Sequence, residues 1–287
     1  MKLTTFESGG RQSYGTVEGA EVIDTGAVLG ARFPDLKALV ASGDIASAIA
    51  SADLSSAPRH KLDEIVLKPV IPNAEKIFCI GLNYEMHRKE TGRSETTYPT
   101  VFTRFAASQI GHGEAMLVPR VSHMLDYEGE LALIIGKGGR YIDEADALSH
   151  VAGYACYNEG SIRDWQRHTH QFAPGKNFPF TGGFGPWMVT ADEIPDPTKL
   201  ELTTRLNGEV MQHATTDMMI FSIPTQISYC SQFSELVPGD VIVTGTPGGV
   251  GFKRDPQVFM KPGDVTEVEI SKIGTLTNPI EAEDKAS

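Results

Sequence analysis

Two glutamates lead directly into an apolar segment that reads as a strand. Glu128 and Glu130 precede the apolar run 131–135. In an extended chain, side chains at positions i and i+2 point to the same side, so these two carboxylates aim at one point. Ligands that are all oxygen favour a hard cation, Mg²⁺, Mn²⁺ or Ca²⁺, over Zn²⁺. Two ordinary acids at a solvated strand end would show the same spacing.

A third acid ends another apolar segment. Glu159 closes the run 151–158, and Arg163 follows four residues later. If the two strands are neighbours, Glu159 completes a set of three carboxylates that leaves positions open for a substrate. The competing interpretation is a strand-end acid paired with Arg163.

A histidine and a lysine are candidates for proton transfer and charge stabilisation. His87 and Glu90 follow the apolar segment 76–81, and in a helix they are neighbours, so the carboxylate can orient the imidazole and raise its basicity. A surface helix of mixed charge has the same pattern. Lys176, in a stretch rich in glycine and proline, suits an anionic substrate or a developing enolate, although most such lysines are merely solvated.

Other motifs carry weaker signals. The glycine-rich segment 244–251 offers backbone N–H groups and the Thr246 hydroxyl to a carboxylate, or forms a tight turn. It has neither the P-loop ending nor the dinucleotide spacing, and Gly-Xaa-Ser-Xaa-Gly is absent. His168 and His170 lack a third nitrogen or sulfur ligand at supporting spacing. The three cysteines are far apart in apolar segments, which is typical of small buried side chains.

The elements that must position these residues are mainly strands. Short apolar segments bounded by Gly, Pro or Asn predict strands over 3–6, 13–17, 21–24, 76–81, 131–136, 151–157, 187–190, 200–206, 240–244 and 264–270. Asn207 and Gly208 predict a hairpin turn. Helices are expected over 35–40, 44–52, 84–89, 145–148 and 222–233, with Asp35 and Ser222 as N-caps.

Length and charge narrow the class of protein. The chain has 287 residues and a formal charge of −12, which disfavours nucleic acid and anionic membrane surfaces as partners. We expect a small N-terminal α+β domain over 1–70 and a catalytic domain over 71–287. No apolar run is long enough for a bilayer, and the first residues lack the apolar block of a signal peptide, so we expect a cytoplasmic protein.

Taken in order, the motifs resemble the fumarylacetoacetate hydrolase family over about residues 71–281. The matching pieces are 76–84 with His87, 126–131, 185–190, 207–209, 238–242, 245–251 and 261–264. The resemblance implies a mainly β fold with a few helices (α+β), whose C-terminal part is a β-roll or barrel. It also implies a homodimer and one Mg²⁺ or Mn²⁺ on Glu128, Glu130 and the acid at 159, whereas oxygen ligands by themselves would also accept Ca²⁺. The family usually has Asp there, so Glu159 must shift its backbone or bind through water.

The remaining site residues follow from the resemblance position by position. The family's substrate contacts match Gln166, Lys176, Thr246, Arg104 and Ser108. His87, oriented by Glu90, becomes the base that activates water. The resemblance implies a small 2-oxo acid as substrate. Because His87 and Glu90 are both present, we expect a metal-dependent hydrolase that cleaves the C–C bond of an acylpyruvate-type 2,4-diketo acid to pyruvate and a carboxylic acid, in aromatic or related catabolism.

Two other functions stand beside hydrolysis. Relatives of the same fold decarboxylate or isomerise 2-oxo or 2-hydroxydienoic diacids, and carbon dioxide release or a spectral shift without pyruvate would favour that chemistry. A protein that binds a divalent cation or an oxo acid without turnover is the third option, because Glu159 departs from the family pattern. The pair His87 and Glu90, together with Lys176, argues against it.

Overall fold

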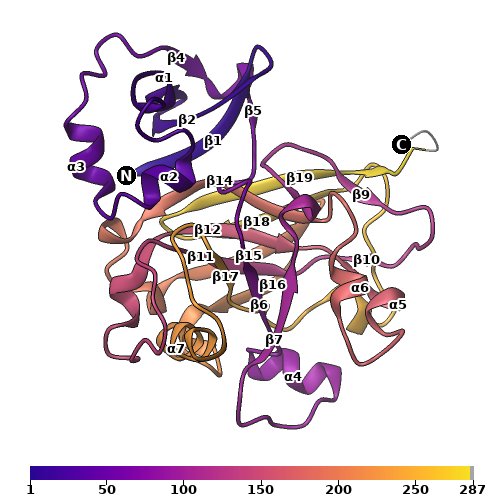
Figure 1. Ribbon diagram of the computed structural model, residues 1–287. Helices are drawn as coiled ribbons and strands as arrows, with labels where there is room; N and C mark the ends of the chain where they lie inside the picture. The colour runs from indigo at the N-terminus through magenta and orange to yellow at the C-terminus, as the bar shows by residue number, and fades with distance from the viewer. Residues whose placement is uncertain (285–287) are drawn as a thin grey trace.

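One large sheet runs through the molecule from the N-terminal strands to the far end (Figure 1). The structure is a computed structural model that describes residues 1–284. The twelve strands are, in spatial order, β4 (Arg59–Lys61), β3 (Glu21–Ile23), β2 (Arg11–Glu18), β1 (Lys2–Ser8), β14 (Gly182–Thr190), β12 (Val151–Glu159), β11 (Gly129–Ile135), β17 (Val241–Val243), β6 (Ile77–Gly81) and β7 (Thr100–Arg104), with β5 (Val66–Leu67) beside β1 and β8 (Gln109–Ile110) beside β14.

A second sheet lies against the middle of the first. Its five strands are, in spatial order, β16 (Glu209–Thr215), β15 (Glu201–Leu206), β18 (Val265–Ile270), β19 (Gly274–Ala282) and β9 (Met116–Val118). The predicted hairpin is present, because Asn207 and Gly208 join β15 to β16 with positive φ at both residues. A short pair, β10 (Leu125–Asp126) and β13 (Ser161–Ile162), stands apart from both sheets.

Strand β11 is apolar throughout because both of its faces are covered. Leu131 and Leu133 belong to the core shared with the second sheet, which includes Leu202. Ala132 and Ile134 face the opposite core, which contains Leu39 of the N-terminal part. Strands buried on both faces read as continuous apolar runs, which is why this segment was recognisable in the sequence.

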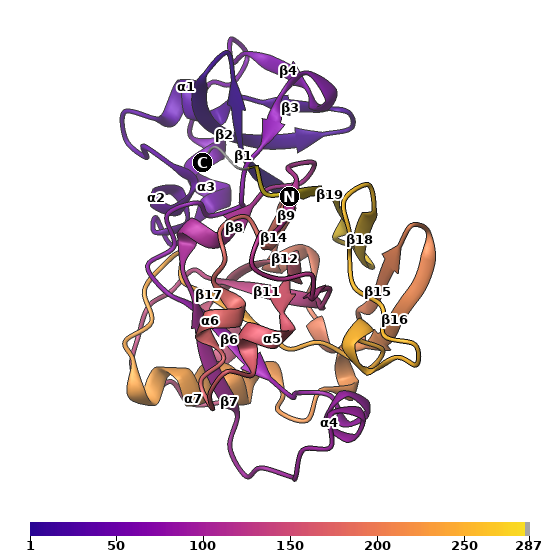
Figure 2. The same ribbon diagram turned by 90° about the vertical axis from the view of Figure 1, so that its right-hand side faces the viewer.

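The N-terminal strands extend the central sheet. β1 pairs with β14, with Lys2 opposite Val189 and Leu3 opposite Met188. In Figure 1 this N-terminal part forms the indigo end of the molecule, and Figure 2 shows it at the end opposite to α4 (Glu85–Thr91). The division of the chain near residue 70 stays a prediction.

Helices are short, apart from one. They are α1 (Thr25–Leu29), α2 (Leu36–Val40), α3 (Ile45–Ala50), α4, α5 (Arg163–Gln166), α6 (Ala173–Lys176) and α7 (Ile223–Phe233). The two predicted caps are confirmed: the Asp35 carboxylate accepts from the Ala38 N–H, and the Ser222 hydroxyl accepts from the Thr225 N–H. The helix expected over 145–148 is instead a 3₁₀ turn, Ala147–His150. The fold is mainly β with a few helices, as expected, and no helix within residues 1–284 is long and apolar enough to cross a bilayer.

Candidate metal centre and its cavity

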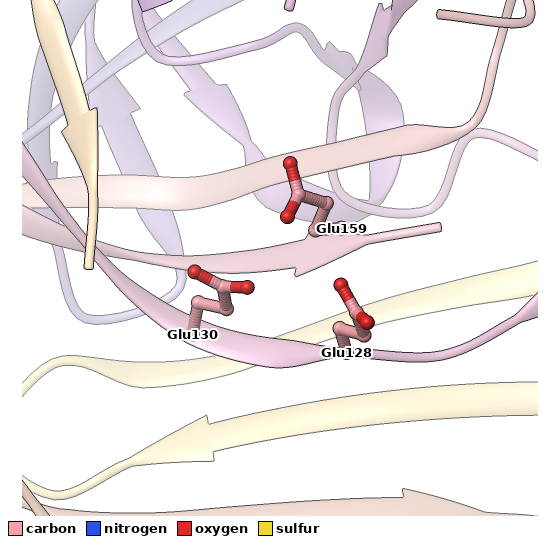
Figure 3. A group of neighbouring side chains, drawn as sticks. All are labelled: Glu128, Glu130 and Glu159. Atoms are coloured by element: carbon pink, nitrogen blue, oxygen red, sulfur yellow. The ribbon is translucent and has the colours of Figure 1, made fainter. Parts of the chain in front are cut away.

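Strand pairing brings the three glutamates together. β11 and β12 are antiparallel, with Gly129 opposite Asn158, so the start of β11 meets the end of β12. The Glu159 N–H donates to the Glu128 carbonyl oxygen at 2.8 Å, which locks the two segments at this level. Carboxylate oxygens of Glu128, Glu130 and Glu159 lie within 4.8 Å of one another, and all three side chains are buried (Figure 3).

Arg163 and Lys176 form ion pairs with two of the three carboxylates. Arg163 Nη1 lies 2.7 Å from Glu128, and Lys176 Nζ lies 2.5 Å from Glu128 and 3.1 Å from Glu159. Burial opposes ionisation of Glu128, but the charges of Arg163 and Lys176 outweigh it and hold its pKa below the usual range. Burial raises the pKa of Glu130 well above its usual value, and the charges of Glu159 and Glu128 add to the effect. Without a bound cation, Glu130 therefore favours its protonated form, because the ion pairs with Arg163 and Lys176 involve only Glu128 and Glu159.

The donor set fits a hard divalent cation. Three carboxylates face two cationic side chains, and the ion pairs of those side chains within the cluster involve Glu128 and Glu159 but not Glu130. Oxygen Oε1 of Glu159 is buried and has no hydrogen-bond partner among residues 1–284. A buried carboxylate oxygen without a partner is costly unless a cation compensates it. The longer side chain of Glu159 does not keep its carboxylate from converging with the other two.

Asp126 fixes the frame around the centre. This fully buried carboxylate accepts from the N–H groups of Gly251 and Phe252, each at 2.9 Å, and from Arg163 Nε at 2.7 Å. Arg163 in turn contacts Glu128. The Asp126 carboxylate thus joins α5 to the turn at 251–252, and Arg163 extends this connection to Glu128.

The glycine-rich loop contacts the centre through its backbone. The Gly245 N–H donates to Oε2 of Glu130 at 2.5 Å. Gly245 has φ +101, and a Cβ there would stand 2.7 Å from Cβ of Asn83, so only glycine fits. The Thr246 hydroxyl donates to the Gly129 carbonyl at 3.0 Å and accepts from Gln212 Nε2 at 2.7 Å. Thr246 therefore hydrogen-bonds to the first residue of β11 and also lines the cavity.

His87 and Glu90 form the predicted pair on α4. His87 Nδ1 lies 2.7 Å from Oε1 of Glu90, and Oε2 of Glu90 accepts from the Gly249 N–H at 2.9 Å. A carboxylate at Nδ1 holds the proton on that nitrogen and leaves Nε2 as the basic one. The pair therefore supplies an oriented base, and Glu90 also joins α4 to the glycine-rich loop.

A cavity of about 600 Å³ opens onto these groups. Its lining includes seven of the predicted site residues, Glu128, Glu130, Glu159, His87, Lys176, Gln166 and Thr246. Phe102 and Phe172 supply an apolar wall, and the Lys176 ammonium lies 5.0 Å from the Phe102 ring centre. His168 and His170 stand exposed at the cavity and lie outside the carboxylate cluster.

Two expected substrate contacts do not line the cavity. Arg104 donates to the Gly160 carbonyl at 3.0 Å and to the Thr181 hydroxyl at 2.8 Å, and Ser108 donates to the Phe105 carbonyl at 2.8 Å. Their role in substrate binding stays a prediction. The alternative pairing of Arg163 with Glu159 is not what the structure shows, because Arg163 pairs with Glu128 and Asp126.

The chain is similar to proteins of one known family. The family model "Fumarylacetoacetate (FAA) hydrolase C-terminal" matches residues 76–281. The mitochondrial oxaloacetate tautomerase fahd2 of Xenopus laevis is 38% identical over 98% of this chain and 90% of its own. A fumarylacetoacetate hydrolase from Exiguobacterium antarcticum (34% identity, TM-score 0.84) and a maleylpyruvate hydrolase from Sphingobium sp. SYK-6 with manganese(II) and pyruvate (27%, 0.82) each cover 99% of this chain and 100% of their own.

The expectation of a cytoplasmic location is wrong by this comparison, because the tautomerase relative is named as a mitochondrial protein. That expectation rested on the lack of an apolar leader. An apolar leader marks secretion, whereas mitochondrial import uses amphipathic segments, so its lack could not support a cytoplasmic location.

Proposed function

Because the chain belongs to the fumarylacetoacetate hydrolase family, we propose that it is a divalent-metal-dependent tautomerase that interconverts the keto and enol forms of a 2-oxo diacid such as oxaloacetate. The observation that carries the proposal is the convergence of three buried carboxylates in a cavity that His87 and Lys176 also line. Similarity to an oxaloacetate tautomerase over nearly the whole chain favours isomerisation over the hydrolysis that the sequence motifs favoured.

The reaction moves one proton. The C3–H bond of the keto form breaks, its electron pair moves toward the C2 oxygen, and a proton joins that oxygen. Nε2 of His87 is the group available to take the C3 proton, because Nδ1 is held by Glu90. A positioned base of this kind accelerates proton transfer by about 10²–10⁴-fold.

The negative charge on the enolate oxygen needs compensation in a buried site. Glu128, Glu130 and Glu159 would hold a Mg²⁺ or Mn²⁺, which supplies positive charge beside the 2-oxo-acid oxygens when bound. Although burial opposes its charge, Lys176 stays cationic because Glu128 and Glu159 raise its pKa. Lys176 therefore adds a fixed positive charge at the same place.

Hydrolysis of an acylpyruvate is the second candidate. The same His87 and Glu90 pair suits activation of water for attack on a distal carbonyl, after which a pyruvate enolate leaves. A maleylpyruvate hydrolase with manganese and pyruvate shares the fold, which supports this option.

The two candidates differ in their products. We expect the protein, supplied with Mg²⁺, to speed the disappearance of the oxaloacetate enol without forming pyruvate, and to leave acetylpyruvate uncleaved. Formation of pyruvate and acetate in equal amounts from acetylpyruvate would show that the protein is a hydrolase and not a tautomerase. Carbon dioxide from oxaloacetate, above the level that metal alone produces, would indicate a decarboxylase.

A further inference from the structure

The cavity is lined by cationic side chains that do not contact the three glutamates. Its lining includes Arg167 and Lys253, and neither side chain forms an ion pair within residues 1–284. By contrast, Arg163 and Lys176 are both engaged with the glutamates. The chain as a whole has a formal charge of −12, so two cationic side chains without an ion pair at a cavity contrast with its excess of acidic residues.

Both cations pack on one aromatic ring. The Arg167 guanidinium lies 4.9 Å from the Phe252 ring centre, and Lys253 Nζ lies 5.5 Å from the same ring. The ring leaves their N–H groups free for an anion, because a cation–π contact uses the charge without using the donors. Two exposed cations therefore stand at one part of the cavity wall.

This part of the wall is fixed relative to the metal centre. The Phe252 N–H and Arg163 Nε both donate to Oδ2 of Asp126, and Arg163 begins the helix α5 that Arg167 follows. Asp126 is two residues from Glu128 in the chain. The segments that carry Arg167 and Lys253 are thus both held by hydrogen bonds to Asp126.

We propose that Arg167 and Lys253 form a second carboxylate-binding position, which selects 2-oxo acids with a distal carboxylate over monoacids of the same length. The proposal rests on the proposed function in one respect, that the 2-oxo-acid end binds at the glutamate centre. Charge-assisted hydrogen bonds from Arg and Lys are the means of recognition. These two residues are specificity determinants and take no part in the proton transfer.

Binding of a matched ligand pair tests this position without turnover. The probes are 2-oxoglutarate and 2-oxopentanoate, which have the same five-carbon chain and differ only in a carboxylate against a methyl group. Their dissociation constants are measured by calorimetry with the Mg²⁺-supplied full chain and with the double variant Arg167→Gln, Lys253→Gln. The control is Arg140→Gln, Lys2→Gln, since both of those cations also pack on rings but do not line the cavity.

We expect the unmodified protein and the control to prefer 2-oxoglutarate. In the double variant, 2-oxoglutarate should bind about tenfold more weakly while 2-oxopentanoate stays within about twofold. The proposal is overturned if the unmodified protein shows no preference, if both ligands weaken equally, or if the control loses the same preference. Failure of oxaloacetate tautomerisation with this binding pattern intact would count against the proposed function alone.

Discussion

Glu159 lies in the buried carboxylate cluster, and its Oε1 atom has no hydrogen-bond partner among the described residues. We expect Glu159→Gln to weaken Mn²⁺ binding by at least about tenfold, because the variant keeps the shape and loses the charge. Glu159→Asp should bind Mn²⁺ at least as well as the Gln variant.

Electron paramagnetic resonance of free Mn²⁺ measures these affinities directly. Glu269→Gln is the matched control, because Glu269 pairs with Arg205 at 2.6 Å on the surface. Unchanged affinity in Glu159→Gln would show that Glu159 is no ligand.

His87 and Glu90 make separate contributions that variants can resolve. His87→Gln should lower kcat for tautomerisation by about 10²–10⁴-fold, since it removes the base. Glu90→Gln should lower it less, because the imidazole remains but loses its orienting carboxylate. Steady-state kinetics and Mn²⁺ titration are measured together on both variants. A loss of metal affinity that matches the loss of kcat would contradict the assignment, since neither residue belongs to the carboxylate cluster.

The sequence predicted the residues whose role depends on local spacing. Glu128 and Glu130 converge because they are two residues apart in extended chain, and His87 meets Glu90 because they are three apart in a helix. Asp126 and Arg163 were beyond reach, because their contact joins positions 37 residues apart and depends on how α5 folds back. Residue spacing along the chain does not predict a contact between positions so far apart.

Among the elements, the buried strands were the easiest to predict. β11 and β12 have long apolar runs because both faces of the sheet are covered. β19 was missed because it includes Pro279, and proline argues against a strand. The helix α6 was missed because its sequence, Ala-Pro-Gly-Lys, has none of the periodicity of a helix, although it places Lys176 in the site.

The loop that follows β17 depends on glycine at one position. Gly245→Ala should weaken Mn²⁺ binding and lower stability, because its Cβ would meet Asn83 and displace the N–H that holds Glu130. Gly43→Ala is the control, since Gly43 also has positive φ but has open space around it. Urea unfolding and Mn²⁺ titration are compared for the two variants. Equal effects in both would mean that backbone conformation alone, and not the crowding at Gly245, decides the outcome.

At the scale of the whole molecule, metal binding should depend on pH. Glu130 has a raised pKa in the metal-free protein because of burial and the charges of Glu159 and Glu128. A proton on Glu130 must leave before the carboxylate can bind a cation, so acid favours the metal-free form and affinity should rise with pH. Calorimetry in two buffers of different ionisation enthalpy measures the protons released. No release, with an affinity independent of pH, would contradict this coupling.

The most direct measurement of the central claim follows the ultraviolet absorbance of the oxaloacetate enol. The metal-stripped protein is compared with protein resupplied with Mg²⁺ and with Mg²⁺ alone, while pyruvate and carbon dioxide are assayed in the same samples. The proposed function predicts fast conversion of enol to keto form only with protein and Mg²⁺ together, with no pyruvate or carbon dioxide above the Mg²⁺ control. Equal rates without the metal, or pyruvate and carbon dioxide as the products, would contradict it.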